Sequence, residues 1–223
     1  MKTHSDFQSS QDVAIRTLRA AGVLPVVTVD SAAQGVAVAR ALAQGGLGTI
    51  EIALRTPAAR DAIAAIKQEL PAVIVGAGTV RVPEDVERAR AAGADFLVTP
   101  GTTAALAEAL VESGIPATPA AATPTELLEL ASRGFRIAKL FPVGALGGLK
   151  LIRLLQGPLP DLLLAPSGGI TEAEAPEYLA QPNVVCVGGS WMVPREWLAA
   201  GKYDEVAAAA ARARRLVDAV ALV

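Results

Sequence analysis

Short apolar runs alternate with longer alanine-rich segments along the chain from residue 24 onwards. Each run has six to eight residues and is rich in valine, isoleucine and leucine, which is typical of a buried strand. The predicted strands are LPVVTV (24–29), TIEIAL (49–54), VIVGAGTV (73–80), DFLVTP (95–100), IPATPA (115–120), RIAKLFP (136–142), LLLAPSGG (162–169) and VVCVGGS (184–190). Between them, helices are predicted over 31–45, 56–70 and 123–134, where Ser31, Thr56 and Thr123 are suitable N-caps.

Eight strand–helix units in one chain of 223 residues predict a parallel sheet, and eight is the number that closes as a (β/α)8 TIM barrel. An open doubly wound sheet is the alternative, but VTVDSAAQ after the first strand lacks the glycine fingerprint that usually opens such folds. An additional helix is predicted over about 9–22. We therefore expect one domain over 1–223, with 1–8 as a disordered leader.

Two charged residues interrupt strands that are otherwise apolar. Strand side chains alternate between two faces, so Glu51 and Arg55 lie opposite the isoleucines of 49–54. The same alternation places Lys139 on one face with Ile137 and Phe141. The carboxylate and the amine are therefore expected to share the space enclosed by the strands.

This pair has two interpretations. One is a structural ion pair, although buried pairs are often no more stabilising than apolar residues of similar volume. The other is a catalytic lysine, because removal from water favours the neutral amine that attacks a carbonyl. Arg55 adds a neighbouring positive charge, and Glu51 is the proton carrier that such chemistry requires.

Two glycine pairs point to an anion. They lie in PSGGIT (166–171) and VGGSW (187–191), where Ser190 adds a hydroxyl donor. Glycine lets backbone N–H groups approach a phosphate, and the ends of the last two strands are the usual phosphate site of such barrels. Thr79 and the pair Thr99–Pro100 end two other strands, where polar groups that face the substrate are expected.

Composition excludes several other classes of function. The net charge of −2 gives no basic surface for nucleic acid or an anionic membrane. The single cysteine, Cys186, allows no intramolecular disulfide and is expected to fill the core. The single histidine, His4, excludes a histidine-built metal site in the core.

No apolar run approaches the ~18 residues of a membrane span, and no signal peptide is recognised, so a cytoplasmic protein is expected. Trp191 and Trp197 are interpreted as packing or interface residues.

The motifs EIALRT, GAGTV, TPG, KLFP, GGI and GGSW, in this order and spacing, resemble the bacterial 2-keto-3-deoxy-6-phosphogluconate (KDPG) aldolases, which also act on 4-hydroxy-2-oxoglutarate (KHG). The resemblance extends from about Val23 to Tyr203. It implies a class I aldolase that cleaves KDPG to pyruvate and D-glyceraldehyde 3-phosphate. It also implies a homotrimer, with no cofactor beyond a covalent imine and no metal.

The resemblance assigns roles to individual residues. Lys139 resembles the Schiff-base lysine, and Glu51 the general acid and base that acts through a water. The pyruvate end of the substrate is assigned to Arg55, Thr79, Pro100 and Phe141. The phosphate end is assigned to Ser167, Gly168, Gly169, Gly189 and Ser190.

Three positions depart from the family pattern. Ser167 replaces a threonine but keeps the hydroxyl, Val143 replaces an alanine, and Ala120 replaces a glycine. The methyl group of Ala120 is expected to narrow the pocket, which affects the choice of aldehyde more than the reaction itself.

Two other functions remain open at this stage. A phosphate-binding barrel isomerase or epimerase would use Glu51 and Lys139 as a plain acid and base. A non-catalytic barrel would bind a sugar phosphate without releasing pyruvate.

Overall fold

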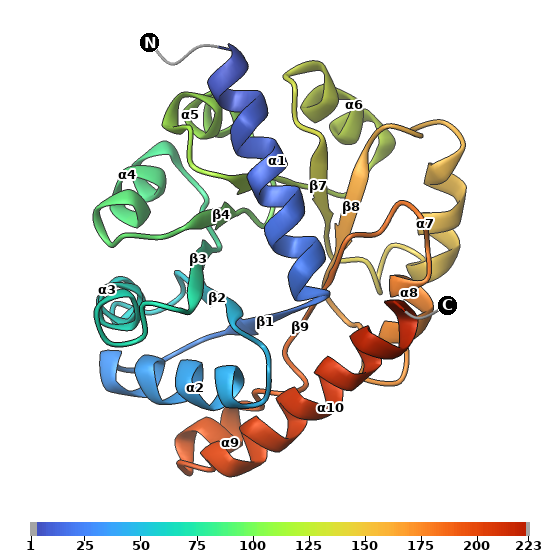
Figure 1. Ribbon diagram of the computed structural model, residues 1–223. Helices are drawn as coiled ribbons and strands as arrows, with labels where there is room; N and C mark the ends of the chain where they lie inside the picture. Colours follow the sequence, from blue (N-terminus) through green and yellow to red (C-terminus); the bar gives the residue numbers. More distant parts are fainter. Residues whose placement is uncertain (1–3, 222–223) are drawn as a thin grey trace.

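Nine strands and ten helices lie along residues 4–221, the part of the chain that the computed structural model describes (Figure 1). The strands are β1 (Val23–Val27), β2 (Thr49–Ala53), β3 (Ile74–Gly78), β4 (Phe96–Val98), β5 (Ala117–Thr118), β6 (Ala120–Ala121), β7 (Ile137–Leu140), β8 (Leu163–Pro166) and β9 (Val187–Gly189). The helices are α1 (His4–Ala21), α2 (Ala32–Gln44), α3 (Ala59–Glu69), α4 (Pro83–Ala91), α5 (Ala104–Ser113), α6 (Pro124–Ser132), α7 (Gly148–Gln156), α8 (Ala175–Leu179), α9 (Arg195–Ala199) and α10 (Tyr203–Ala221).

All strand pairs are parallel, as the sequence predicts. Six strands are ordered β5-β4-β3-β2-β1-β9, and three more are ordered β6-β7-β8. The predicted strand 115–120 contains β5 and, beyond Pro119, the start of β6, which pairs with β7 instead of β4. Helices α2–α10 lie around the outside of the strands (Figure 1). The chain thus has a parallel α/β architecture.

The first helix starts earlier than predicted. It begins at His4, so the expected disorder of 1–8 is wrong for residues 4–8, and residues 1–3 lie outside the described part. Phe7 is buried and meets the Phe135 ring edge-on at 5.1 Å between centroids. The fully buried Gln11 donates through Nε2 to the Ala117 carbonyl. These contacts order a stretch whose polar composition resembles an unstructured leader.

Two of the three predicted N-caps are confirmed. Ser31 accepts a hydrogen bond from the Gln34 N–H, and Thr123 forms a reciprocal capping box with Glu126. Thr56 is not a cap, because its hydroxyl donates to the Val29 carbonyl and α3 begins later, after Ala58. A hydroxyl that precedes a helix can cap that helix or can donate to a carbonyl elsewhere in the chain. The local sequence pattern does not distinguish these two roles.

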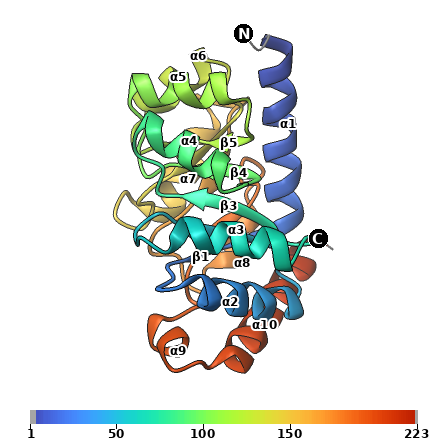
Figure 2. The ribbon, with the colours of Figure 1, turned by 90° about the vertical axis from the view of Figure 1, so that its left-hand side faces the viewer.

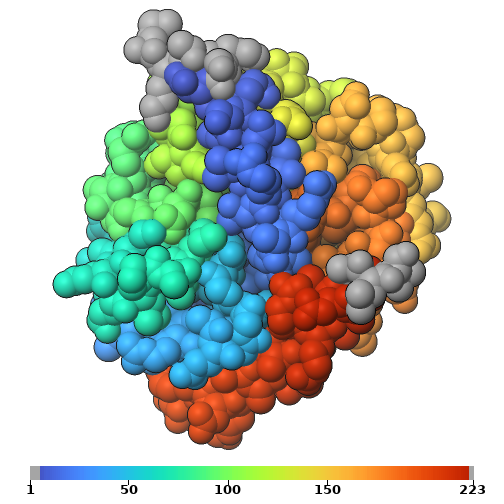
Figure 3. All heavy atoms as spheres, viewed as in Figure 1, coloured from blue at the N-terminus to red at the C-terminus, as the bar shows by residue number. Residues whose placement is uncertain are grey.

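The strands separate two apolar cores. The larger core lies between strands and outer helices and includes Ile50, Ile52 and Leu140, so the predicted faces of these strands are confirmed. The smaller core joins Ile137 and its neighbours to Leu18 and other residues of α1. Helix α1 crosses the strands in Figure 1, covers the middle of the same face in Figure 3, and stands along one side of the molecule in Figure 2. No helix among residues 4–221 is long and apolar enough to cross a membrane.

Candidate active site

The structure brings Lys139 and Glu51 together from β7 and β2. Lys139 Nζ lies 3.7 Å from Glu51 Oε1, and the side chains are only 9% and 2% exposed. This separation is longer than a direct hydrogen bond but within ion-pair range. An ammonium and a carboxylate removed from water require each other, since either alone would be strongly unfavourable.

A glycine on the neighbouring strand makes room for the carboxylate. Gly78 ends β3 beside Ala53 of β2, and a Cβ atom at position 78 would overlap the carboxyl group of Glu51. Any larger residue there would displace Glu51 from Lys139. Gly78, the second glycine of the GAGTV motif, is therefore needed to leave space for the Glu51 carboxylate and not to form a turn.

The surroundings of the pair are apolar on one side and aromatic on the other. The Lys139 ammonium lies 5.2 Å from the centroid of the Phe141 ring, within range of a cation–π contact. Cys186 is fully buried near the pair, and burial, together with the nearby Glu51 charge, raises the pKa of its thiol to about 12. The thiol therefore stays protonated and fills the core as a small hydrophobe, as predicted.

A cavity of about 620 Å³ opens over Lys139 at the carboxyl ends of the strands. This is the end of a parallel α/β fold where substrates bind. Among the predicted site residues, the cavity is lined by Arg55, Lys139, Phe141, Ser167, Gly168, Gly169, Gly189 and Ser190. Residues from the ends of β2, β7, β8 and β9 therefore share one space with the lysine.

Thr79 contacts the cavity indirectly. Its hydroxyl accepts a hydrogen bond of 3.2 Å from Arg55 Nε, which orients the guanidinium. Thr79 does this at φ = 59°, a left-handed conformation that is unusual for a β-branched residue and stores strain. Strained backbone of this kind clusters at functional sites.

The two predicted glycine sites also line the cavity. Gly168 and Gly169 both have positive φ, of 93° and 88°, which other residues rarely adopt. Next to them, the Thr171 hydroxyl and N–H both donate to the Glu174 carboxylate, and these bonds lower the pKa of Glu174. The loop after β8 is thereby held with its backbone facing the cavity.

Some predictions for the site differ from what the structure shows. Pro100 is half-buried but is not among the residues that line the cavity. Ala120 is buried and also lines no part of it; its N–H donates to the Thr99 hydroxyl, so the expected narrowing of the pocket does not occur. Trp191 packs against the larger core, as predicted for a packing residue, and it also lines the cavity.

Sequence reasoning missed several residues of this cavity. Val26 and Thr28 contribute from the end of β1, and their spacing of two residues is the signal that would have identified them. Arg195 lies at the rim and is paired with Asp30 at 3.7 Å. Trp191 follows the second glycine pair, and its ring occupies the space that a Cβ atom at Gly189 would need.

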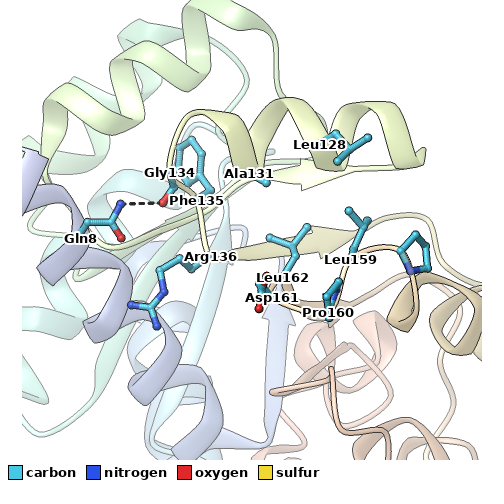
Figure 4. Close-up of a pocket in the computed structure, with 11 residues that line it drawn as sticks. Gln8, Leu128, Ala131, Gly134, Phe135, Arg136, Leu159, Pro160, Asp161 and Leu162 are labelled. Atoms are coloured by element: carbon cyan, nitrogen blue, oxygen red, sulfur yellow. Dashed lines mark hydrogen bonds between the residues drawn. The ribbon is translucent and has the colours of Figure 1, made fainter.

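A second cavity, of about 380 Å³, shares no lining residue with the first (Figure 4). Gln8 and Arg136 reach it from one side and Leu159 and Leu162 from the other. Its charged members are Arg136, which pairs with Asp12, and Asp161. Among the described residues, no lysine lines this second cavity, whereas Lys139 lines the first.

Comparison with known proteins agrees with the resemblance that the sequence motifs indicated. The model of the KDPG and KHG aldolase family matches residues 14–209. The KHG/KDPG aldolase of Escherichia coli K12 is 42% identical over 184 residues, which cover 82% of this chain and 86% of the relative.

Two solved structures are similar in fold and sequence. The KDPG aldolase of Legionella pneumophila, with pyruvate captured as a covalent carbinolamine, has a TM-score of 0.87 and 35% identity over 89% of this chain and 96% of its own. That of Zymomonas mobilis ZM4 with 3-phosphoglycerate has a TM-score of 0.84 and 35% identity over 91% of this chain and 94% of its own. The chain therefore belongs to the KDPG and KHG aldolase family.

Proposed function

We propose that this protein is a class I aldolase that cleaves KDPG to pyruvate and D-glyceraldehyde 3-phosphate through an imine on Lys139. The observation that carries the proposal is the buried pair of Lys139 and Glu51, in which Lys139 lines the cavity with Arg55 and two glycine pairs while Glu51 lies behind the lysine, outside the cavity lining. An ion pair with only a structural role would not need a cavity beside it, nor Arg55 and the hydroxyls of Ser167 and Ser190 in the lining of that cavity.

The cavity suits a substrate with an anion at each end. Arg55 presents a planar guanidinium that binds a carboxylate through two N–H groups. The backbone around Gly168, Gly169 and Gly189, with the Ser190 hydroxyl, suits the phosphate. Ser167 lines the cavity beside these glycines and adds a further donor.

The reaction begins when Lys139 passes its ammonium proton to Glu51, and the neutral amine that results attacks the C2 ketone of the substrate. Glu51 moves protons as the carbinolamine forms and loses water, which gives an iminium ion. The iminium accepts the electron pair of the C3–C4 bond as this bond breaks, and the C4 hydroxyl gives its proton to the Glu51 carboxylate. D-Glyceraldehyde 3-phosphate leaves, and the remaining enamine is protonated at C3 and hydrolysed to pyruvate and free Lys139.

The positions of Lys139 and Glu51 fit their roles as nucleophile and proton carrier. Glu51 lies 3.7 Å from the nitrogen that becomes the imine, so its carboxylate is close to the substrate atoms that gain and lose protons beside that nitrogen. The apolar core beneath them keeps bulk water from the amine. Thr79 holds Arg55 and so fixes the carboxylate end, while Phe141 covers the amine.

One experiment separates the proposal from its rivals. The protein is incubated with pyruvate and borohydride, and peptide mass mapping locates the adduct. We expect a reduced pyruvate adduct on Lys139 and, in a coupled lactate dehydrogenase assay, pyruvate release from KDPG that chelator does not reduce. An isomerase or epimerase would give no adduct, and a binding protein would give phosphate affinity without pyruvate.

The same proposal extends to the second family substrate. KHG carries a carboxylate where KDPG carries the phosphate-bearing carbons, and cleavage would give pyruvate and glyoxylate by the same steps. The E. coli relative is named for both activities. Turnover of KHG, KDPG and its galactonate-derived epimer in parallel assays ranks the three substrates.

We also infer that the chain forms one closed (β/α)8 barrel domain, assembles as a homotrimer and works in the cytoplasm. Two observations support closure: Pro119 joins β5 of one sheet directly to β6 of the other, and parallel bridges at Leu164–Val184 and Ser167–Gly188 link β8 to the region of β9. Light scattering of the purified protein tests the trimer.

A further inference from the structure

A second, very small space lies between the catalytic pair and the inner core. Its volume is about 10 Å³, near the least that holds one water molecule. Glu51 and Lys139 line it together with Thr118, Ser167 and Cys186. The rest of the lining comes from Leu18, Leu24, Val98, Ala165 and Gly188.

Thr118 contributes the one hydroxyl of this space that is buried without a partner in the described protein. The residue ends β5 and is only 2% exposed, and its Oγ1 forms no hydrogen bond with any described protein group. A buried hydroxyl without a partner is unfavourable, so a residue of this kind indicates a ligand or a water. Valine has the same shape and would fill the position without that cost.

The neighbouring groups show what such a water would contact. Glu51 offers carboxylate oxygens and Lys139 an amine, and the Ser167 hydroxyl can accept or donate. Cys186 remains a neutral thiol and is a weak partner. A water bound by Thr118 would therefore have two to four polar partners, the number that internal waters typically have.

We propose that Thr118 is a positioning residue of the aldolase, whose hydroxyl holds one water against Glu51 and Lys139. This inference rests on the proposed aldolase function and adds a residue to it. The water fixes the carboxylate at the distance from which it takes a proton from the carbinolamine and returns one to the enamine. No bond to Thr118 forms or breaks, because its hydroxyl acts only as a hydrogen-bond partner.

The test compares three variants with the wild-type protein. Thr118→Val removes the hydroxyl and keeps the shape, whereas Thr118→Ser keeps the hydroxyl. Thr49→Val is the matched control, because Thr49 is also a buried strand threonine but lines neither the catalytic cavity nor the small space. For each protein, kcat and KM for KDPG are measured, with the rate at which pyruvate methyl hydrogens exchange in deuterated water.

We expect Thr118→Val to lower kcat and methyl exchange together, by about five- to tenfold, the effect of one lost hydrogen bond. KM should change less than about twofold, since the hydroxyl does not touch the substrate. Thr118→Ser should restore most of the rate, and Thr49→Val should match the wild type. Thermal unfolding of each variant verifies that the fold is intact.

Two outcomes overturn the inference. If Thr118→Val matches the wild type in kcat and exchange, the hydroxyl plays no part in proton transfer. If Thr118→Ser is as slow as Thr118→Val, the methyl group and not the hydroxyl matters. Both outcomes leave the aldolase proposal standing, whereas a wild-type protein that neither cleaves KDPG nor forms an adduct on Lys139 removes both.

Discussion

The two ends of the strands differ in almost every physical respect. At the carboxyl ends, Lys139, Arg55 and the glycine pairs line a cavity of about 620 Å³. At the amino ends, Leu18 and Ile15 of α1 pack against Phe96, Ile137 and other apolar residues. One end is polar and open, and the other is apolar and covered.

The difference shows which end of the strands contains features that are unfavourable for the stability of the fold. The cavity end holds the left-handed Thr79 and the buried ion pair, neither of which the fold itself requires. The covered end has well-packed side chains, and its buried Gln11 is hydrogen-bonded on both sides, to Ala117 and Arg136. Substitutions should therefore change activity at the first end and stability at the second.

The largest effect is expected for Lys139→Met, which should abolish turnover, because no other lysine in the described part of the chain lines the cavity to form the imine. Lys139→Arg is the control that keeps the positive charge opposite Glu51 and cannot form an imine. Both are measured by pyruvate release and borohydride trapping. Appreciable activity in either variant would refute the covalent mechanism.

Glu51→Gln should have the next largest effect and reduce kcat by ~10²–10⁴-fold, the usual contribution of a positioned proton carrier. The amide keeps the shape of the side chain, so the variant should fold. Trapping should still modify Lys139, only more slowly. A kcat within a few-fold of the wild type would place the proton carrier elsewhere in the cavity.

Ile15→Ala tests the covered end. Ile15 is buried in the smaller core, and its truncation should lower the free energy of unfolding by about 2–5 kcal/mol. Because Ile15 lines neither the substrate cavity nor the small space beside Glu51 and Lys139, kcat should remain close to that of the wild type at temperatures where the variant is folded. Urea unfolding and steady-state kinetics measure the two quantities, and a large loss of kcat in the folded variant would contradict the separation of the ends.

The smallest effect is expected for Glu126→Gln, at the start of α6. The pKa of Glu126 is lowered, chiefly by the hydrogen bond from the Ala122 N–H, so the carboxylate stabilises the fold at neutral pH and loses this contribution as the pH falls. The group is mostly exposed, so the loss at neutral pH should be at most about 1 kcal/mol. Unfolding curves of variant and wild type should converge in acid; a constant difference at all pH values would assign the effect to packing.

The sequence predicted much of the fold because the signals are local. Apolar runs predict the strands, and the alternation of side chains along each strand was enough to assign Glu51 and Lys139 to the enclosed face. The helix start at His4 was missed, because Phe7 and Gln11 are ordered by partners more than a hundred residues away. Thr118 was missed for a similar reason, since nothing near IPATPA shows that its hydroxyl is beside Glu51.

The sequence by itself determined the order of strands and helices, the parallel direction and the face of each strand that carries charge, because these depend on spacing within a few residues. Only the tertiary structure decided which strand ends meet. The 3.7 Å between Lys139 and Glu51, the hydrogen bond between Arg55 and Thr79, and the position of α1 all depend on how β2, β3 and β7 are staggered around a shared interior. That stagger is set by the packing of the whole chain, so no short stretch of sequence contains it.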